Sequence, residues 1–106
     1  MNLKKIPDGL FGVNDEVCFS AMKQFREYGL NIPEDIAVVG FDNTPMADYF
    51  SPPLTSIDRK SFEIGSTAAY KLLKIIEKKD FASTLSKIVL EPELIIRKTS
   101  KNLAIK

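Results

Sequence analysis

Two apolar runs flank an amphipathic segment in the first part of the chain. Residues 9–13 (GLFGV) and 36–41 (IAVVGF) are continuously apolar, as is typical of parallel strands that are buried on both faces. The apolar side chains between these runs recur at spacings of three and four, as on one face of a helix: Cys18, Ala21, Met22, Phe25 and Tyr28. Asn14 suits the start of this helix and Gly29 its end. The pattern predicts a strand–helix–strand unit whose two strands are adjacent and parallel.

The rest of the chain predicts further helices and strands. The expected elements are a short helix at 46–50, a short strand at 54–57, a long helix at 61–78 and strands at 87–90 and 94–97. Thr44 and Pro45 favour the start of the short helix, with Thr44 as its cap. The long helix has an apolar face made of Phe62, Gly65, Ala69, Leu72, Leu73 and Ile76. Residues 80–86 are expected to form a loop, and residues 100–106 to be frayed. The fold class is therefore α/β: a parallel sheet with a βαβ unit, a long crossover helix and C-terminal strands.

The charge balance argues against a free-standing nucleic-acid-binding domain. The 106 residues, which fit one small domain, include 15 Lys and Arg and 14 Asp and Glu, so the formal net charge is +1. Nucleic-acid-binding domains usually carry a basic excess. The densest basic pairs lie beside apolar or acidic residues and are interpreted as solvated faces: Lys4-Lys5, Lys78-Lys79 and Arg97-Lys98.

The composition offers little catalytic or metal-binding chemistry. One cysteine and no histidine exclude an internal disulfide and remove the commonest metal ligand and the usual general base. Cys18 is expected to be a packed core residue, because it lies on the apolar helix face. An enzyme would need an acid–base pair from four carboxylates: Asp35, Asp42, Asp48 and Asp58. Without a supporting motif we expect no enzyme activity, no metal and no cofactor.

The chain shows no membrane or export signal. No apolar run approaches the ~20 residues of a membrane-spanning helix. The start, MNLKKIPDGLFG, lacks the apolar stretch and the cleavage site of a secretory signal. We therefore expect a cytoplasmic location and no membrane partner.

Asn14 and Asp42 are the candidate ligand-binding residues. Each follows one of the two expected parallel strands, and ligands of open parallel sheets bind beyond the carboxyl ends of the strands. An amide beside a carboxylate can both donate and accept hydrogen bonds, which suits a sugar or a nucleobase. The alternative is structural: Asn14 would cap the helix that follows it, and Asp42 would cap the next turn.

Tyr49 and Phe50 form an aromatic patch beside the prolines at 52 and 53. The patch could cover the core of this small domain. It could equally be a protein–protein interface, where aromatic anchors are favoured. The residues alone leave both interpretations open.

Taken together, these segments resemble the LacI/GalR family of transcriptional repressors. The resemblance is carried by a strand that leads into Asn14-Asp15, by PEDIAVVGFDN at 33–43, by PPLT at 52–55 and by LEPELIIRKTS at 90–100. It extends over residues 6–100. The combination is specific to the family, although no single element would be.

The resemblance implies a two-lobed fold of the periplasmic-binding-protein-like (type I) class behind an N-terminal helix-turn-helix. A small-molecule effector binds in the cleft between the lobes, and sugars are the commonest effectors, with purines as an exception. Asn14 and Asp42 fall on positions that contact the effector in the C-terminal lobe. Other residues fall where family members dimerise: Phe19, Met22, Tyr49 and Phe50.

The resemblance also predicts how the chain is divided. Residues 1–57 and 88–100 would belong to the C-terminal lobe, and the helix at 61–80 to the other lobe. The chain would thus be part of an effector-binding and dimerisation domain, and operator DNA would be bound only through a headpiece outside it. An exposed apolar face on the long helix would favour self-association, including a dimer that exchanges this helix. The alternatives are a piece of a periplasmic sugar-binding protein of the same fold and an enzyme domain.

Overall fold

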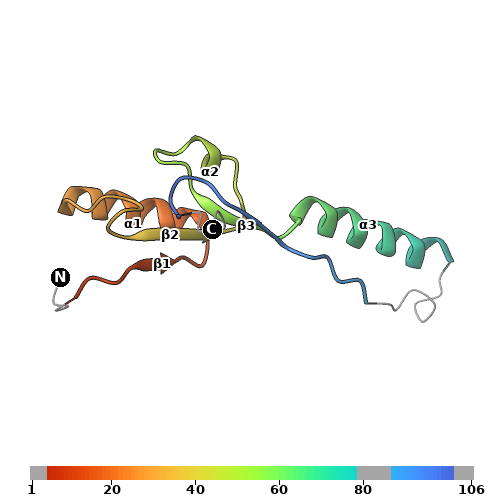
Figure 1. The fold of residues 1–106 in the computed structure, drawn as a ribbon. Coiled ribbons are helices and arrows are strands. Elements are labelled where there is room, and N and C mark those ends of the chain that lie inside the picture. Colours follow the sequence, from red (N-terminus) through yellow and green to blue (C-terminus); the bar gives the residue numbers. More distant parts are fainter. Residues whose placement is uncertain (1–4, 79–86, 102–106) are drawn as a thin grey trace.

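The structure, a computed structural model, describes residues 5–78 and 87–101 and shows one sheet with helices beside it (Figure 1). The elements in chain order are β1 (Gly9–Phe11), α1 (Asp15–Tyr28), β2 (Ala37–Phe41), α2 (Met46–Tyr49), β3 (Thr55–Asp58), α3 (Ser61–Lys78) and β4 (Glu93–Ile95). The four strands lie in the order β1-β2-β3-β4 across the sheet. The α/β class predicted from the sequence is confirmed.

The strand pairing confirms the strand–helix–strand unit. β1 and β2 are adjacent and parallel, with Leu10 opposite Val38. β2 and β3 are also parallel, with Gly40 opposite Ser56. β4 runs antiparallel to β3, so the sheet is mixed rather than wholly parallel.

Of the two predicted C-terminal strands, only the second corresponds to an observed strand in the described residues, β4. Its pairing with β3 covers Glu93–Ile95, which overlaps the strand predicted at 94–97. The prediction of a strand at 87–90 is wrong. β3 ends at Asp58, opposite Glu93, so the preceding residues lie beyond the end of the strand with which they would have to pair. The loop predicted at 80–86 lies outside the described residues.

Local capping sets both ends of α1. Asn14 is the N-cap, and its Oδ1 accepts a hydrogen bond from the backbone N–H of Val17 at 2.9 Å. At the other end Gly29 has φ 98°, in the left-handed region that favours glycine. The N–H of Leu30 then donates to the carbonyl of Phe25 at 2.9 Å. Both predicted ends of this helix are confirmed.

The core lies between the sheet and the two helices α1 and α2. Its fully buried members come from both helices, from β2 and from the residue before β3: Cys18, Met22, Val38, Ala47 and Leu54. Cys18 is a packed core residue, as predicted, and its thiol donates to the carbonyl of Val39 at 3.4 Å. Tyr28 is exposed, contrary to its predicted place on the apolar face. The reason is length: a 14-residue helix spans about 21 Å and the five residues of β2 about 17 Å, so the last turn extends past the sheet (Figure 1).

β1 is an edge strand, and one face of the sheet is open. Phe11 and Val13 are 61% and 74% exposed, so the prediction of a strand buried on both faces is wrong for this segment. Burial alternates along β2: Val38 and Gly40 are buried, and the residues between and beside them are partly exposed. In the described part of the chain, helices thus cover one face of the sheet.

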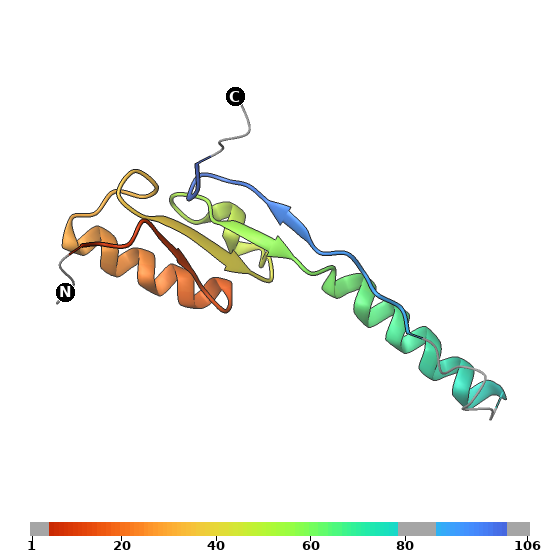
Figure 2. The same ribbon diagram turned by 60° about the horizontal axis from the view of Figure 1, so that its bottom comes forward.

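α3 extends away from the sheet, and residues 87–90 run beside it (Figures 1 and 2). The radius of gyration is 19.0 Å, whereas a compact domain of this length has about 13 Å. The apolar side chains of the helix are exposed rather than packed: Phe62, Ile64, Tyr70, Leu72, Leu73 and Ile76. The sequence predicts this helix correctly, and its apolar face has no sheet to cover it in the described residues.

The C-terminal segment returns to the sheet and is firmly held there. The hydroxyl of Thr99 donates to the carbonyl of Val38 at 2.7 Å and accepts from the backbone N–H of Thr55 at 2.8 Å. Ser100 Oγ lies 2.7 Å from the Thr55 hydroxyl. The predicted fraying is therefore wrong at Ser100, and residues 102–106 lie outside the described part.

Candidate functional site

The predicted ligand site lies at the edge of the sheet where β1 and β2 end. Because these strands are adjacent and parallel, the residues that follow them, Asn14 and Asp42, belong to the same edge. Asn14 is partly buried, and its Oδ1 caps α1, so the structural interpretation holds for this oxygen. The side-chain amide nitrogen is the atom of Asn14 that could still donate to a ligand.

Asp42 pairs with an arginine that the sequence reasoning did not single out. Its Oδ1 lies 2.7 Å from Nε of Arg59, and the two side chains are 31% and 52% exposed. Arg59 directly follows β3, the neighbour of β2, so the parallel pairing brings the two residues to the same edge. An ion pair this exposed adds little to stability, and both of its members remain accessible to a ligand.

A buried carboxylate, Asp15, fixes the loop between β2 and α2. Its Oδ2 accepts from the backbone N–H of Thr44 at 2.7 Å and from the Thr44 hydroxyl at 3.0 Å, and its Oδ1 accepts from Ser56 Oγ at 2.6 Å. A Cβ at Gly40 would collide with this carboxylate, which explains the glycine. The sequence predicted Thr44 as the cap of α2. Its hydroxyl binds Asp15 instead, and no side-chain bond caps α2.

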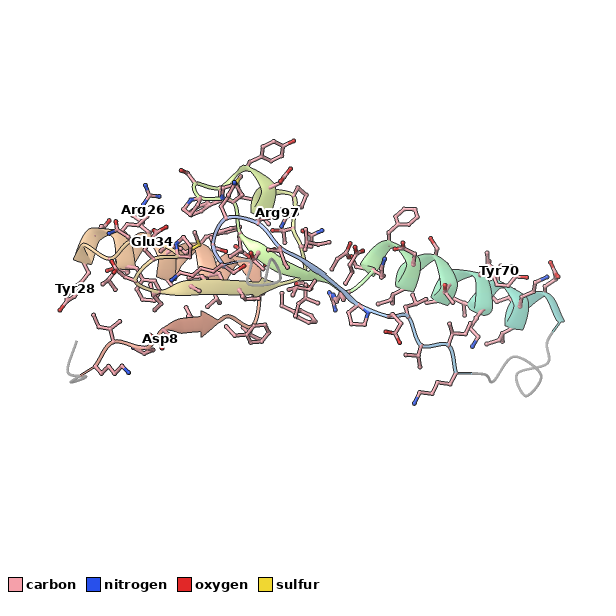
Figure 3. All side chains as sticks on the ribbon, in the orientation of Figure 1. Asp8, Arg26, Tyr28, Glu34, Tyr70 and Arg97 are labelled. Atoms are coloured by element: carbon pink, nitrogen blue, oxygen red, sulfur yellow. The ribbon has the colours of Figure 1, made fainter. Side chains whose placement is uncertain are left out.

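Arg97 holds the same loop from the C-terminal segment (Figure 3). Its Nη2 donates to Oδ1 of Asn43 and its Nη1 to the carbonyl of Leu54, each at 2.7 Å. Its Nε lies 3.3 Å from Oδ1 of Asp48 in α2, and the side chain is 15% exposed. The predicted solvated face is therefore wrong for Arg97, although Lys98 is exposed.

The four carboxylates considered for acid–base chemistry have other partners. Each contacts a cation or a backbone N–H: Asp35 (N–H of Asn31), Asp42 (Arg59), Asp48 (Arg97) and Asp58 (N–H of Lys60). None of these contacts joins two carboxylates. The arrangement suits hydrogen bonding and loop support rather than proton transfer.

The thiol of Cys18, in the core, has a raised pKa. Burial raises the pKa of Cys18 above its ordinary value of 9.0, a hydrogen bond involving the Gly12 backbone partly offsets this, and the charge of Asp15 adds to it. The described residues contain no cluster of three or more potential metal ligands. No helix among them has the length and apolar character to cross a membrane.

The aromatic surface, defined as Phe19, Tyr49 and Phe50, lies where α1 meets α2. The rings of Phe19 and Phe50 are stacked with centroids 4.5 Å apart, and Tyr49 is 80% exposed. An open groove of about 640 Å³ is lined by Phe19 and Phe50 together with Lys23 and Arg26. Met22, which was grouped with these residues, is fully buried in the core and cannot be part of an exposed surface.

Comparisons with known proteins agree with this architecture. The chain matches the family described as periplasmic binding protein-like domain over residues 1–100. It is 36% identical over 101 residues to the HTH-type transcriptional repressor PurR of Vibrio campbellii (strain ATCC BAA-1116), covering 95% of this chain and 30% of that protein. A solved LacI family transcriptional regulator from Enterococcus faecalis V583, with bound ribose, is 37% identical with a TM-score of 0.83, covering 92% of this chain and 36% of that one. A LacI-type regulator from Bacillus cereus subsp. cytotoxis NVH 391-98 is 26% identical with a TM-score of 0.86, covering 95% and 35%.

The fold and these matches define the class as a periplasmic-binding-protein-like domain. The chain belongs to this family, and the relatives that it resembles are an HTH-type transcriptional repressor and LacI-type regulators. It spans about 30% of the length of the curated relatives that it matches. Those relatives are HTH-type transcriptional repressors.

Proposed function

We propose that these residues form part of the effector sensor of a LacI-type repressor, and that its effector is a sugar. The observation that carries the proposal is the accessible Asp42–Arg59 pair where β2 and β3 end. A carboxylate accepts hydrogen bonds from hydroxyl groups, whereas a guanidinium and the amide of Asn14 donate to them. Adjacent sugar hydroxyls need both kinds of partner. The relative that was solved with bound ribose supports a sugar over a nucleobase.

We further propose that this pair links effector binding to the orientation of two lobes. Residues 1–57 and 88–100 would form one lobe and the helix at 61–80 would belong to the other, in keeping with the way α3 extends from the sheet. Arg59 lies between β3 and α3, where the chain would cross. A ligand that contacts Asp42 and Arg59 would favour one lobe arrangement and so change operator affinity through a helix-turn-helix headpiece. Such a repressor would act in the cytoplasm.

The experiment is a calorimetric titration of the regulator that contains these residues with ribose, then with other sugars and with purine bases. Asp42→Ala should weaken ribose binding by about 10- to 100-fold, because hydrogen bonds to a charged group are lost. Operator affinity without ribose should stay unchanged. Glu34→Ala removes an exposed carboxylate on the stretch before β2 and is the matched control.

Two results would count against the proposal. If the wild-type regulator binds ribose and Asp42→Ala binds it equally well, Asp42 does not belong to the site. If the wild-type regulator binds purine bases and no sugar, the proposed effector class is wrong.

We also propose that a second copy packs on the aromatic surface. Tyr49 is the most exposed of the three rings, and aromatic side chains are favoured anchors of interfaces. Tyr49→Ser should weaken dimerisation of the regulator in sedimentation experiments. Tyr70→Ser, which changes an exposed tyrosine on α3, is the control. It shows whether the aromatic surface or the exposed face of α3 makes the dimer. An unchanged dimer in Tyr49→Ser would exclude the aromatic surface.

A further inference from the structure

The loop between β2 and α2 has an uncommon backbone. Asp42 and Asn43 are consecutive residues with φ 109° and 49°, a region that residues with a Cβ seldom occupy. Such a conformation persists only where the surroundings fix it. It occurs at the residue that carries the proposed ligand-binding carboxylate, so the contacts that fix this loop also determine where that carboxylate lies.

Every backbone N–H of the loop has an acceptor. These are the Ile57 carbonyl for Asp42 (2.9 Å), Ser56 Oγ for Asn43 (3.0 Å) and Asp15 Oδ2 for Thr44 (2.7 Å). The side chain of Asn43 is held separately, by Arg97. The acceptors of these backbone N–H groups lie on β3 and α1. The contact from Arg97 to Asn43 therefore joins the loop to the C-terminal segment.

We propose that Arg97 is a positioning residue for the effector site. By holding the side chain of Asn43, it keeps Asp42 in the backbone conformation that presents its carboxylate beside Arg59. The inference rests on the proposed function, because it gives Arg97 an effect on effector affinity through Asp42 rather than by contact with the effector.

The geometry of the guanidinium suits this role. Its three nitrogens face three different parts of the fold: Asn43 in the loop, the carbonyl of Leu54 before β3, and Asp48 in α2. The side chain is 15% exposed and therefore held in place. A lysine has one charged nitrogen and no planar fork, so it could not satisfy all three partners at once.

The first test needs no ligand and uses the 106-residue chain. Amide shifts of Asp42 and Asn43 should move in Arg97→Met and also in Arg97→Lys, which keeps the charge but loses the planar fork. Lys98→Met is the matched control, because Lys98 is an exposed neighbour. Unmoved core amides, at Cys18 and Met22, show that a variant is folded. Should Arg97→Met fail to fold, the loop shifts in Arg97→Lys decide. Loop shifts that stay unchanged in a folded variant overturn the proposal.

The second test measures affinity in the regulator with ribose as the probe. Arg97→Met should weaken ribose binding by about tenfold, and Asn43→Ala should weaken it by a similar factor. The double variant should bind ribose no more weakly than either single variant, because both substitutions remove the same contact. Equal ribose affinity in wild type and Arg97→Met overturns the role of Arg97. Absence of ribose binding in the wild type overturns the proposed effector instead, and the amide shifts alone then decide whether Arg97 positions the loop.

Discussion

At the scale of single residues, Asp15 is a buried polar side chain that connects three segments of the fold. Its fully buried carboxylate accepts three hydrogen bonds from Thr44 and Ser56 and joins the start of α1 to two other segments. Asp15→Ala leaves the partly buried Thr44 N–H and the buried Ser56 hydroxyl without their acceptor. The free energy of unfolding should fall by about 2–4 kcal/mol, as measured by urea unfolding monitored by circular dichroism.

Glu16→Ala is the control for this prediction. Glu16 also lies in the first turn of α1, but it is exposed. Its loss should cost about 0.5 kcal/mol through the helix dipole alone. Equal losses of stability in the two variants would show that the buried hydrogen bonds of Asp15 contribute nothing beyond helix electrostatics.

Cys18 predicts a dependence of stability on alkaline pH. Burial raises its pKa in the folded chain above the ordinary value of 9.0, so the unfolded chain loses this proton first as the pH rises. Above about pH 9 the folded state therefore binds more protons than the unfolded state, and stability falls with rising pH. Urea unfolding at pH 8 and pH 10 should show a larger decrease in wild type than in Cys18→Ala. A decrease of the same size in both would assign the pH dependence to other groups.

The two residues that hold the β2–α2 loop could not have been identified from the sequence. Asp15 meets Ser56 across 41 positions, and Arg97 meets Asn43 across 54. Periodicity and capping rules act over one or two helical turns and carry no information on such pairs. Asn14 and Asp42 could be proposed from the sequence because their position depends only on two adjacent parallel strands. The strand–helix–strand pattern implies such strands.

At the scale of elements, segments with their own local signals were predicted well. α1 has a capping asparagine, an apolar stripe and a terminal glycine, and its predicted bounds are those observed. β1 and residues 87–90 were predicted less well, because exposure and pairing depend on neighbours. An apolar run does not reveal whether helices cover both faces of the strand. It also does not reveal whether the neighbouring strand is long enough to pair with it.

The C-terminal end of α1 provides a prediction about a single element. Gly29 has φ 98° and no atom near the position of an added Cβ, so Gly29→Ala introduces backbone strain alone. The free energy of unfolding should fall by about 1 kcal/mol. Gly65→Ala is the matched control, because Gly65 lies within α3 and also has open space around it. Gly65→Ala should raise the helix content, because alanine has a higher helix propensity than glycine. If Gly29→Ala is neutral, the left-handed cap does not limit the stability of α1.

At the scale of the whole molecule, the chain exposes too much surface for its mass. The accessible surface is 7981 Å², whereas a compact protein of 11.9 kDa exposes about 6,000 Å². The excess goes with the extended shape, in which α3 stands apart from the sheet (Figure 2). The apolar side chains of α3 are exposed to solvent. An apolar face of this kind is typical of a surface that another part of a protein covers.

We therefore predict that the 106-residue chain self-associates through α3. Light scattering after size exclusion should give a mass above that of a monomer, increasing with concentration. Leu73→Gln together with Ile76→Gln replaces two exposed apolar side chains of α3 with good helix formers and should lower the mass by removing the association through α3. Tyr49→Ser, on the aromatic surface, should leave this association in place. A monomeric wild type at high concentration would contradict the prediction.

The rate of subunit exchange then distinguishes two forms of the dimer. If two chains merely lay their α3 faces together, subunits should exchange as fast as the weak contact dissociates. If the chains instead exchange α3 and pack it against each other's residues 87–90, exchange requires the helix to leave a packed site and should be much slower. Mixing two differently labelled populations and following energy transfer over time measures this rate. The slow case predicts in addition that Ile64→Gln, on the side of α3 that borders residues 87–90, accelerates exchange, because it weakens the packing that holds the exchanged helix.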